Sequence, residues 1–134
     1  MLLLDGRPRF IYNYLGLVDT VLESSRCLPV GRVTLTFVFQ KTGAPSHSKA
    51  YGAPGIGRLF LGEEEVASGP LEKTVPLMLN FSGSLTCGYH HAEPFFGYEL
   101  PFRFDGTIRR VDVRTHSNAM IDDALALELY LKSQ

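Results

Sequence analysis

The chain has 134 residues, of which 45% are hydrophobic and 20% are charged, and its formal net charge is −1 at pH 7. This composition is typical of one folded domain and excludes a disordered chain. The 13 Lys and Arg residues are balanced by 14 Asp and Glu residues and form no basic stripe, which argues against a nucleic-acid partner. No apolar run has the length of a secretory signal or a membrane span, so we expect a soluble, cytoplasmic protein without a membrane partner.

The two cysteines, Cys27 and Cys87, are too few for a disulfide framework and are not part of a CxxC pair. We expect them to be reduced thiols that pack as small buried side chains.

The first part of the chain predicts strands. A turn at Asp5-Gly6-Arg7-Pro8 separates strands over 1–4 and 9–15, and a third strand follows over 17–24. The clearest strand covers 32–40, where apolar residues alternate with other residues and β-branched and aromatic side chains are frequent.

The middle of the chain predicts a long loop and a hairpin. Residues 41–57 are rich in Gly, Pro and hydroxyl side chains and read as one loop. A turn at Gly62-Glu63-Glu64 joins short strands over 58–61 and 65–68. The three glutamates Glu63, Glu64 and Glu65 read as a solvated hairpin tip, and a further strand is predicted over 75–81.

The last third predicts an irregular segment, a hairpin and a helix. Residues 82–101 are irregular and aromatic, and the Asp105-Gly106 turn predicts a last hairpin of strands 102–104 and 107–114. Apolar residues recur at helical spacing over about 118–132. The pattern therefore predicts a single all-β domain over 1–134: an antiparallel β-sandwich over 1–115, jelly-roll-like or concanavalin-like, with one C-terminal α-helix.

Five segments, in order along the chain, share patterns with one known family. They are 4–17 (LDGRPRFIYNYLGL), 28–35 (LPVGRVTL), 55–62 (GIGRLFLG), 65–69 with 74–76 (EVASG and TVP), and 100–108 (LPFRFDGTI). This series resembles the C-terminal region of bacterial arylsulfatases, from Leu4 to about Val113. The resemblance implies a β-sandwich that in those enzymes is appended to a catalytic domain. Since Met1 lies inside what relatives treat as a strand, the chain is expected to be either a fragment or a lone accessory module.

The resemblance does not extend to the catalytic machinery of that family. Sulfatases use a C-x-P-x-R nucleophile motif beside a divalent cation, whereas the segment Cys27-Leu28-Pro29-Val30-Gly31-Arg32 places its arginine one residue too late. The loop at 87–94 also departs from the Asp- and Gly-rich pattern of the family. We therefore expect no catalytic residue, and we interpret Cys27 as structural.

The most site-like cluster lies in this same loop, at Tyr89, His90, His91 and Glu93. Two imidazoles and a carboxylate suit zinc, but adjacent side chains of an extended chain point to opposite faces, so His47 or His116 would have to complete the set. We expect no metal and no cofactor. The cluster is instead a candidate ligand-binding rim, with His47 contributed by the 41–57 loop, and a solvated loop without ligand is the alternative.

The sequence leaves three functions open. The first is a non-catalytic accessory or assembly module, as a homodimer or with a separate protein partner, because a sandwich without its catalytic neighbour exposes apolar surface. The second is a binding module for carbohydrate or a sulfated ligand. The third, independent enzyme activity, lacks a recognisable set of nucleophile, base and orienting residue.

Overall fold

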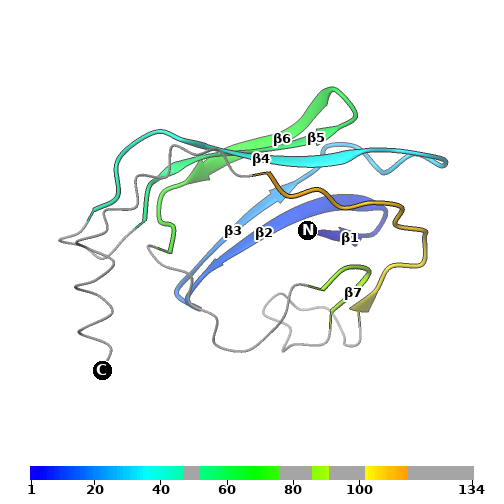
Figure 1. Ribbon diagram of the computed structural model, residues 1–134, viewed down its shortest axis with the longest axis horizontal. Coiled ribbons are helices and arrows are strands. Elements are labelled where there is room, and N and C mark those ends of the chain that lie inside the picture. The colour runs from blue at the N-terminus through cyan, green and yellow to red at the C-terminus, as the bar shows by residue number, and fades with distance from the viewer. Residues whose placement is uncertain (47–51, 76–85, 91–101, 115–134) are drawn as a thin grey trace. The chain divides into compact units, whose positions relative to one another are not determined.

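The computed structural model describes residues 1–46, 52–75, 86–90 and 102–114 of the chain (Figure 1). The chain divides into two compact units, Met1–Phe104 and Asp105–Gln134. Every regular element of the described residues is a β-strand, which confirms the all-β prediction for that part of the chain. The strands are β1 (Leu2–Leu4), β2 (Arg7–Tyr14), β3 (Val18–Glu23), β4 (Leu35–Lys41), β5 (Gly55–Leu61), β6 (Glu64–Leu71), β7 (Tyr89–His90) and β8 (Phe102–Arg103).

The first sheet is antiparallel, with strand order β1-β2-β3. Asp5 and Gly6 both have positive φ, at 50° and 73°, and form the two-residue turn that pairs Leu4 with Arg7. Asp and Gly tolerate this backbone region and it matches the twist of the strands, so the Asp-Gly signal correctly located the first hairpin. The predicted strands 1–4, 9–15 and 17–24 are confirmed with boundaries that differ by one or two residues.

The second sheet is also antiparallel, with order β4-β5-β6. The predicted hairpin after residue 57 is confirmed, but both of its strands are longer than the sequence suggested, so the prediction of one loop over 41–57 is wrong at its end. The start of β5 was not predicted, because Gly55 and Gly57 have no side chains and so do not contribute to an alternation of apolar and polar residues. A register shift at Leu59/Phe60 marks an irregularity in the pairing with β6.

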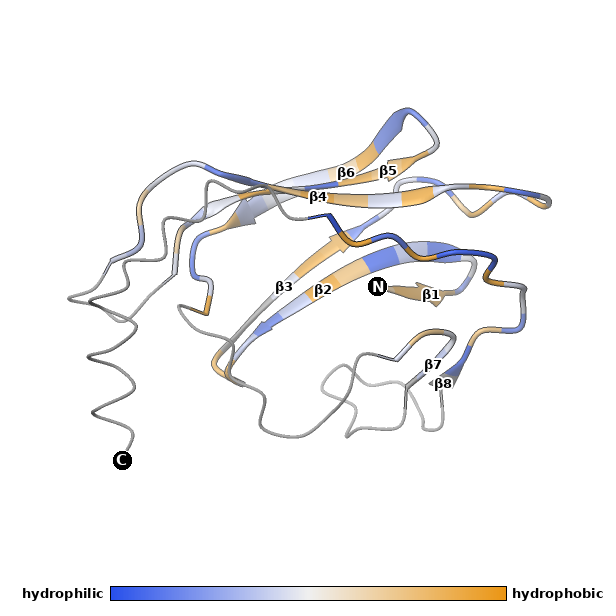
Figure 2. Ribbon diagram, viewed as in Figure 1, coloured by the Kyte–Doolittle hydropathy of each residue, from blue (hydrophilic) through white to orange (hydrophobic). Residues whose placement is uncertain are grey.

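The two sheets of the first unit contact each other, and Figure 2 shows that their strands carry both apolar and polar residues. Phe10 of β2 stacks on Phe37 of β4, with ring centroids 3.5 Å apart. The Leu22 side chain of β3 lies close to Gly57 and Gly69 of the other sheet: an ideal Cβ at these positions would be 2.9 Å and 2.8 Å from its methyl carbons. Around these contacts lies the core of the described residues. Its buried hydrophobic residues are Tyr14, Leu22, Ala53, Leu59, Val66 and Leu71.

The chain that leaves β3 is tied to β6. The Ser25 backbone N–H donates to the Val66 carbonyl at 3.0 Å, and Arg26 forms an ion pair with Glu64. Ser24 is buried, and its hydroxyl accepts from the Arg26 N–H and donates to the Arg26 carbonyl. The two bonds of the Ser24 hydroxyl satisfy a buried polar side chain. The Ser25–Val66 bond and the Arg26–Glu64 ion pair join the two sheets.

The structure corrects the last predicted hairpin. Phe102–Arg103 pairs with Tyr89–His90 rather than with residues after Gly106, and residues 104–114 contain no strand. Alternation alone does not make a strand, because a strand also needs a neighbouring backbone with which to form hydrogen bonds.

The remaining sequence predictions fall largely or wholly outside the described residues. Val75 is not in a strand, and the rest of the predicted strand 75–81 lies outside the described residues, as do most of the irregular segment 82–101 and the whole helix at about 118–132. No helix of membrane-spanning length occurs among the residues that the structure describes.

Both cysteines are free of disulfide bonds, as predicted, but both are exposed. The expectation that they pack as small buried side chains is therefore wrong. Cys27 lies in the segment after β3 and Cys87 lies just before β7, and neither segment belongs to a sheet interior.

Candidate functional site

Two of the five predicted ligand-binding residues lie in β7. Tyr89 pairs with Arg103 and His90 with Phe102, and the Phe104 N–H donates to the Gly88 carbonyl at 2.9 Å. Gly88 has a φ of 81°, which lets the chain turn sharply into β7. The other three predicted residues, His47, His91 and Glu93, lie outside the described residues.

A shallow pocket of about 420 Å³ opens beside this strand pair. Its lining residues are Cys87, Gly88, Tyr89, Arg103 and Phe104. Opposite residues of an antiparallel pair project from the same face of the sheet, so the cross-strand neighbours Tyr89 and Arg103 share one face. The Tyr89 side chain is 51% exposed, and Arg103 is exposed as well.

The chemistry of this pocket differs from the one predicted. A guanidinium group offers a planar set of donors that matches the oxygens of a sulfate, phosphate or carboxylate, and an aromatic ring offers a stacking face. The pocket therefore combines an anion-recognising group with an aromatic platform. Arg103 is not among the predicted site residues, because the sequence pattern placed 102–104 in a different hairpin. Only the observed strand pairing brings Arg103 opposite Tyr89.

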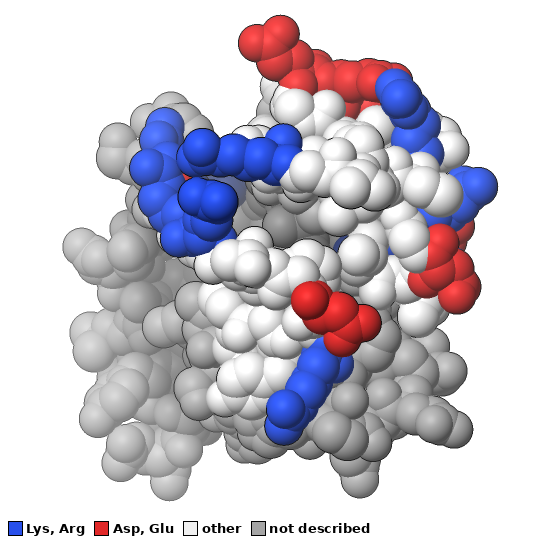
Figure 3. Space-filling view, turned by 90° about the vertical axis from the view of Figure 1, so that its right-hand side faces the viewer, with Lys and Arg blue, Asp and Glu red and all other residues white. Residues whose placement is uncertain are grey.

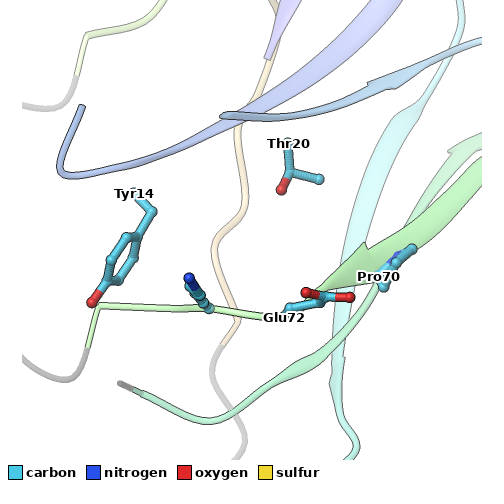
Figure 4. A pocket seen from close by; sticks show the side chains of 5 residues that line it. Tyr14, Thr20, Pro70 and Glu72 are labelled. Carbon is cyan, nitrogen blue, oxygen red and sulfur yellow. The ribbon is translucent and has the colours of Figure 1, made fainter. Parts of the chain in front are cut away.

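A second pocket of about 230 Å³ lies where β2 and β6 end and β3 begins (Figure 4). Figure 4 shows Tyr14 of β2 and Thr20 of β3 on one side, with Pro70 of β6 and Glu72 on the other. Lys73 completes the lining. None of these five residues is among the site residues predicted from the sequence.

Two hydrogen bonds hold residues 74 and 75, which directly follow the lining residues Glu72 and Lys73. Thr74 donates from its hydroxyl to the Ala53 carbonyl at 2.7 Å, and the Val75 N–H donates to the Tyr12 hydroxyl at 2.7 Å. The lining offers one carboxylate, one ammonium group and two hydroxyls, which suits a small polar molecule. None of the described residues that line it is a cysteine, serine or histidine.

No group of three or more His, Cys, Asp or Glu side chains converges in the described ranges 1–46, 52–75, 86–90 and 102–114. The segment from Cys27 to Arg32 follows β3 as irregular chain, and the Leu28 N–H donates to the Gly6 carbonyl at 2.7 Å. This bond fastens the segment to the first β-hairpin.

Glu63 lies in the β5–β6 turn, and Glu64 and Glu65 begin β6. All three are exposed, as predicted for a solvated hairpin tip. Figure 3 shows acidic side chains gathered at the top of the view. Glu64 pairs with Arg26, while Glu65 lies 4.0 Å from Arg58. Because these ion pairs are exposed, each contributes little to stability.

No protein-family model, curated protein or solved structure matches the chain. The resemblance to the C-terminal region of arylsulfatases thus stays a prediction from the sequence.

Proposed function

We propose that this chain is a non-catalytic accessory module that acts by associating with another polypeptide, first of all with a second copy of itself. The observation that carries the proposal is the distribution of apolar side chains. Among the described residues, twelve large hydrophobic side chains are exposed, whereas six hydrophobic residues are buried. Isolated exposed apolar residues are normal, but this proportion favours a surface that another chain covers.

Exposed apolar side chains occur on the outward faces of both sheets. Val21 of β3 is 49% exposed, whereas the side chain of its neighbour Leu22 points toward the other sheet. Val38 of β4 similarly follows Phe37, whose ring stacks on Phe10, and Val38 is 42% exposed. Since side chains alternate along a strand, both valines lie on faces directed away from the contact between the sheets.

The fold that we propose for the complete domain is a β-sandwich of the jelly-roll type, similar to the C-terminal region of arylsulfatases. Support comes from two antiparallel three-stranded sheets that contact each other through the stacked rings of Phe10 and Phe37. Further support comes from the five sequence segments that resemble that family. In those enzymes this region is appended to a catalytic domain, so a module of this kind is expected to carry a surface that contacts another domain or chain.

The test of this proposal is the mass of the purified chain in solution, measured by size exclusion with light scattering between 1 and 100 µM (about the range in which weak dimers form). We expect a species of twice the 14.9 kDa chain mass to increase with concentration. A chain that stays at 14.9 kDa over the whole range contradicts self-association.

A second candidate function is a binding module for a sulfated carbohydrate or a similar anion. One observation favours it: Arg103 and Tyr89 are opposite each other beside the 420 Å³ pocket, so that a guanidinium group and an aromatic ring share one face. The test is the melting temperature with sulfated and with unsulfated disaccharides. A ligand that binds the folded state raises this temperature, and we expect a rise only with the sulfated sugar.

A further inference from the structure

Residues 107–114, with the sequence TIRRVDVR, have the composition of a strand but belong to no sheet. Every side chain in this segment is exposed, including Ile108 at 45%, Val111 at 55% and Val113 at 75%. β-branched residues favour strands because they pack well on a pleated surface. A segment of this kind with exposed apolar side chains and no strand partner is a template for pairing with another chain.

The charges within the segment point to a particular partner. The Arg110 guanidinium, through Nε, lies 2.8 Å from the Asp112 carboxylate, through Oδ2. Residues two apart in an extended chain project to the same side, so this contact is the one expected of extended backbone. Both side chains are largely exposed, at 77% and 50%, and thus accessible to a second chain.

The segment is complementary to itself in the antiparallel direction. When two copies pair around Val111, that residue faces its equivalent, and Arg110 of each copy faces Asp112 of the other. The two Arg110–Asp112 pairs then lie on one face of the paired strands, and the pair of Val111 side chains lies on the other face. Such cross-strand pairs stabilise antiparallel sheets. On the Val111 face, Arg109 lies opposite Val113, so no like charges face each other there.

We propose that residues 107–114 form an antiparallel two-stranded interface with the same segment of a second copy, centred on Val111. The inference rests on the proposed self-association and identifies the surface that performs it. A two-stranded ribbon of this length is only marginally stable in water, so we expect a weak dimer that forms at micromolar concentrations.

The test exchanges the charges one at a time. Arg110→Asp places two carboxylates opposite each other across the interface, and Asp112→Arg places two guanidinium groups there. Each variant alone should dimerise about tenfold more weakly than the wild-type chain. A mixture of the two variants should form a heterodimer, because the two carboxylates of one chain then face the two guanidinium groups of the other.

The heterodimer distinguishes the interface from a charge effect within one chain, since a contact within one chain cannot be restored by mixing. Arg32→Asp and Glu63→Arg serve as matched controls, because they change the net charge equally at exposed positions of the first unit and should leave dimerisation unchanged. Circular dichroism establishes that each variant folds.

The possible outcomes separate the two proposals. A monomeric wild-type chain contradicts the proposed self-association and this interface with it. A wild-type dimer that Arg110→Asp leaves intact contradicts only the interface at 107–114. Two weakened variants that remain monomeric when mixed contradict the register around Val111.

Discussion

The rings of Phe10 and Phe37 lie nearly parallel, with 7° between their planes and 3.5 Å between their centroids, and they join the two three-stranded sheets. Phe10 pairs with Leu22 across the first sheet, and Phe37 pairs with Leu59 across the second. Leu22 and Leu59 are both buried. The half-buried stacked pair therefore adjoins the buried leucines of the first unit's core.

Removing one ring should destabilise the fold. Phe37→Ala is expected to lower the free energy of unfolding by about 3 kcal/mol, since a large apolar side chain is lost and a cavity is left against Phe10. Urea denaturation measures the change. Val38→Ala is the matched control: the side chain points away from the other sheet, so it should cost less than about 1 kcal/mol. Equal losses in the two variants would contradict the central role of the stack.

Gly57 should not tolerate a side chain. An ideal Cβ at this position would lie 2.8 Å from Leu71 Cδ1, 2.9 Å from Leu22 Cδ1 and 3.0 Å from Phe37 Cε2. Gly57→Ala is therefore expected to lower the free energy of unfolding by about 1–3 kcal/mol through overpacking.

Gly69 provides the comparison, because among the described residues a Cβ there would meet only Leu22 Cδ2, at 2.8 Å. In a Leu22→Ala background the cost of Gly69→Ala should disappear, while the cost of Gly57→Ala should fall only in part. Thermal denaturation of the single and double variants measures both costs. If the two glycines behave alike in that background, the close approach of Leu71 and Phe37 to Gly57 is wrong.

The Tyr12 hydroxyl should stabilise the segment after β6. It accepts a hydrogen bond from the Val75 N–H at 2.7 Å, across 63 positions of sequence. Tyr12→Phe leaves that partly buried N–H without its acceptor, which should cost about 1–2 kcal/mol. The Val75 amide should also exchange with deuterium faster than in the wild-type chain. Unchanged exchange at Val75 would show that this bond does not form in solution.

Arg103 should govern any response to anions at the pocket beside β7. Arg103→Gln is expected to abolish the rise in melting temperature with a sulfated disaccharide, because the amide keeps some hydrogen-bonding capacity but loses the charge. Arg58→Gln changes the charge equally at a distant strand, β5, and should have no such effect. A sulfated sugar that stabilises the Arg103→Gln variant as much as the wild-type chain would place the binding site elsewhere.

Local signals in the sequence located most of the elements of the first unit. The Asp5-Gly6 pair marked a turn because few residue types adopt positive φ without strain. The alternation over 32–40 marked β4 because one face of that strand packs against the other sheet. Both signals depend only on residues that are close together in the chain. The turn is confirmed, and the predicted strand over 32–40 is confirmed except at its start, because β4 begins at Leu35.

The candidate site was predicted only in part, because it depends on a pairing between residues that are far apart in the chain. Tyr89 was singled out from its neighbours, but Arg103 joins it through a strand pairing that spans fourteen positions. The prediction assigned 102–104 to a hairpin with 107–114, because the Asp105-Gly106 dipeptide has the same local chemistry as Asp5-Gly6. Turn chemistry permits a hairpin, whereas the competition between possible partners decides whether one forms.

The sequence by itself determined which segments favour extended backbone, where tight turns are possible and which side chains are apolar, since backbone sterics and side-chain hydration act within a few residues. Only the tertiary structure decided which strands pair, that Leu22 packs against Gly57 and Gly69, and that the apolar residues of 107–114 stay exposed. These outcomes depend on hydrogen bonds and packing between residues far apart in the chain, for which every segment competes with every other.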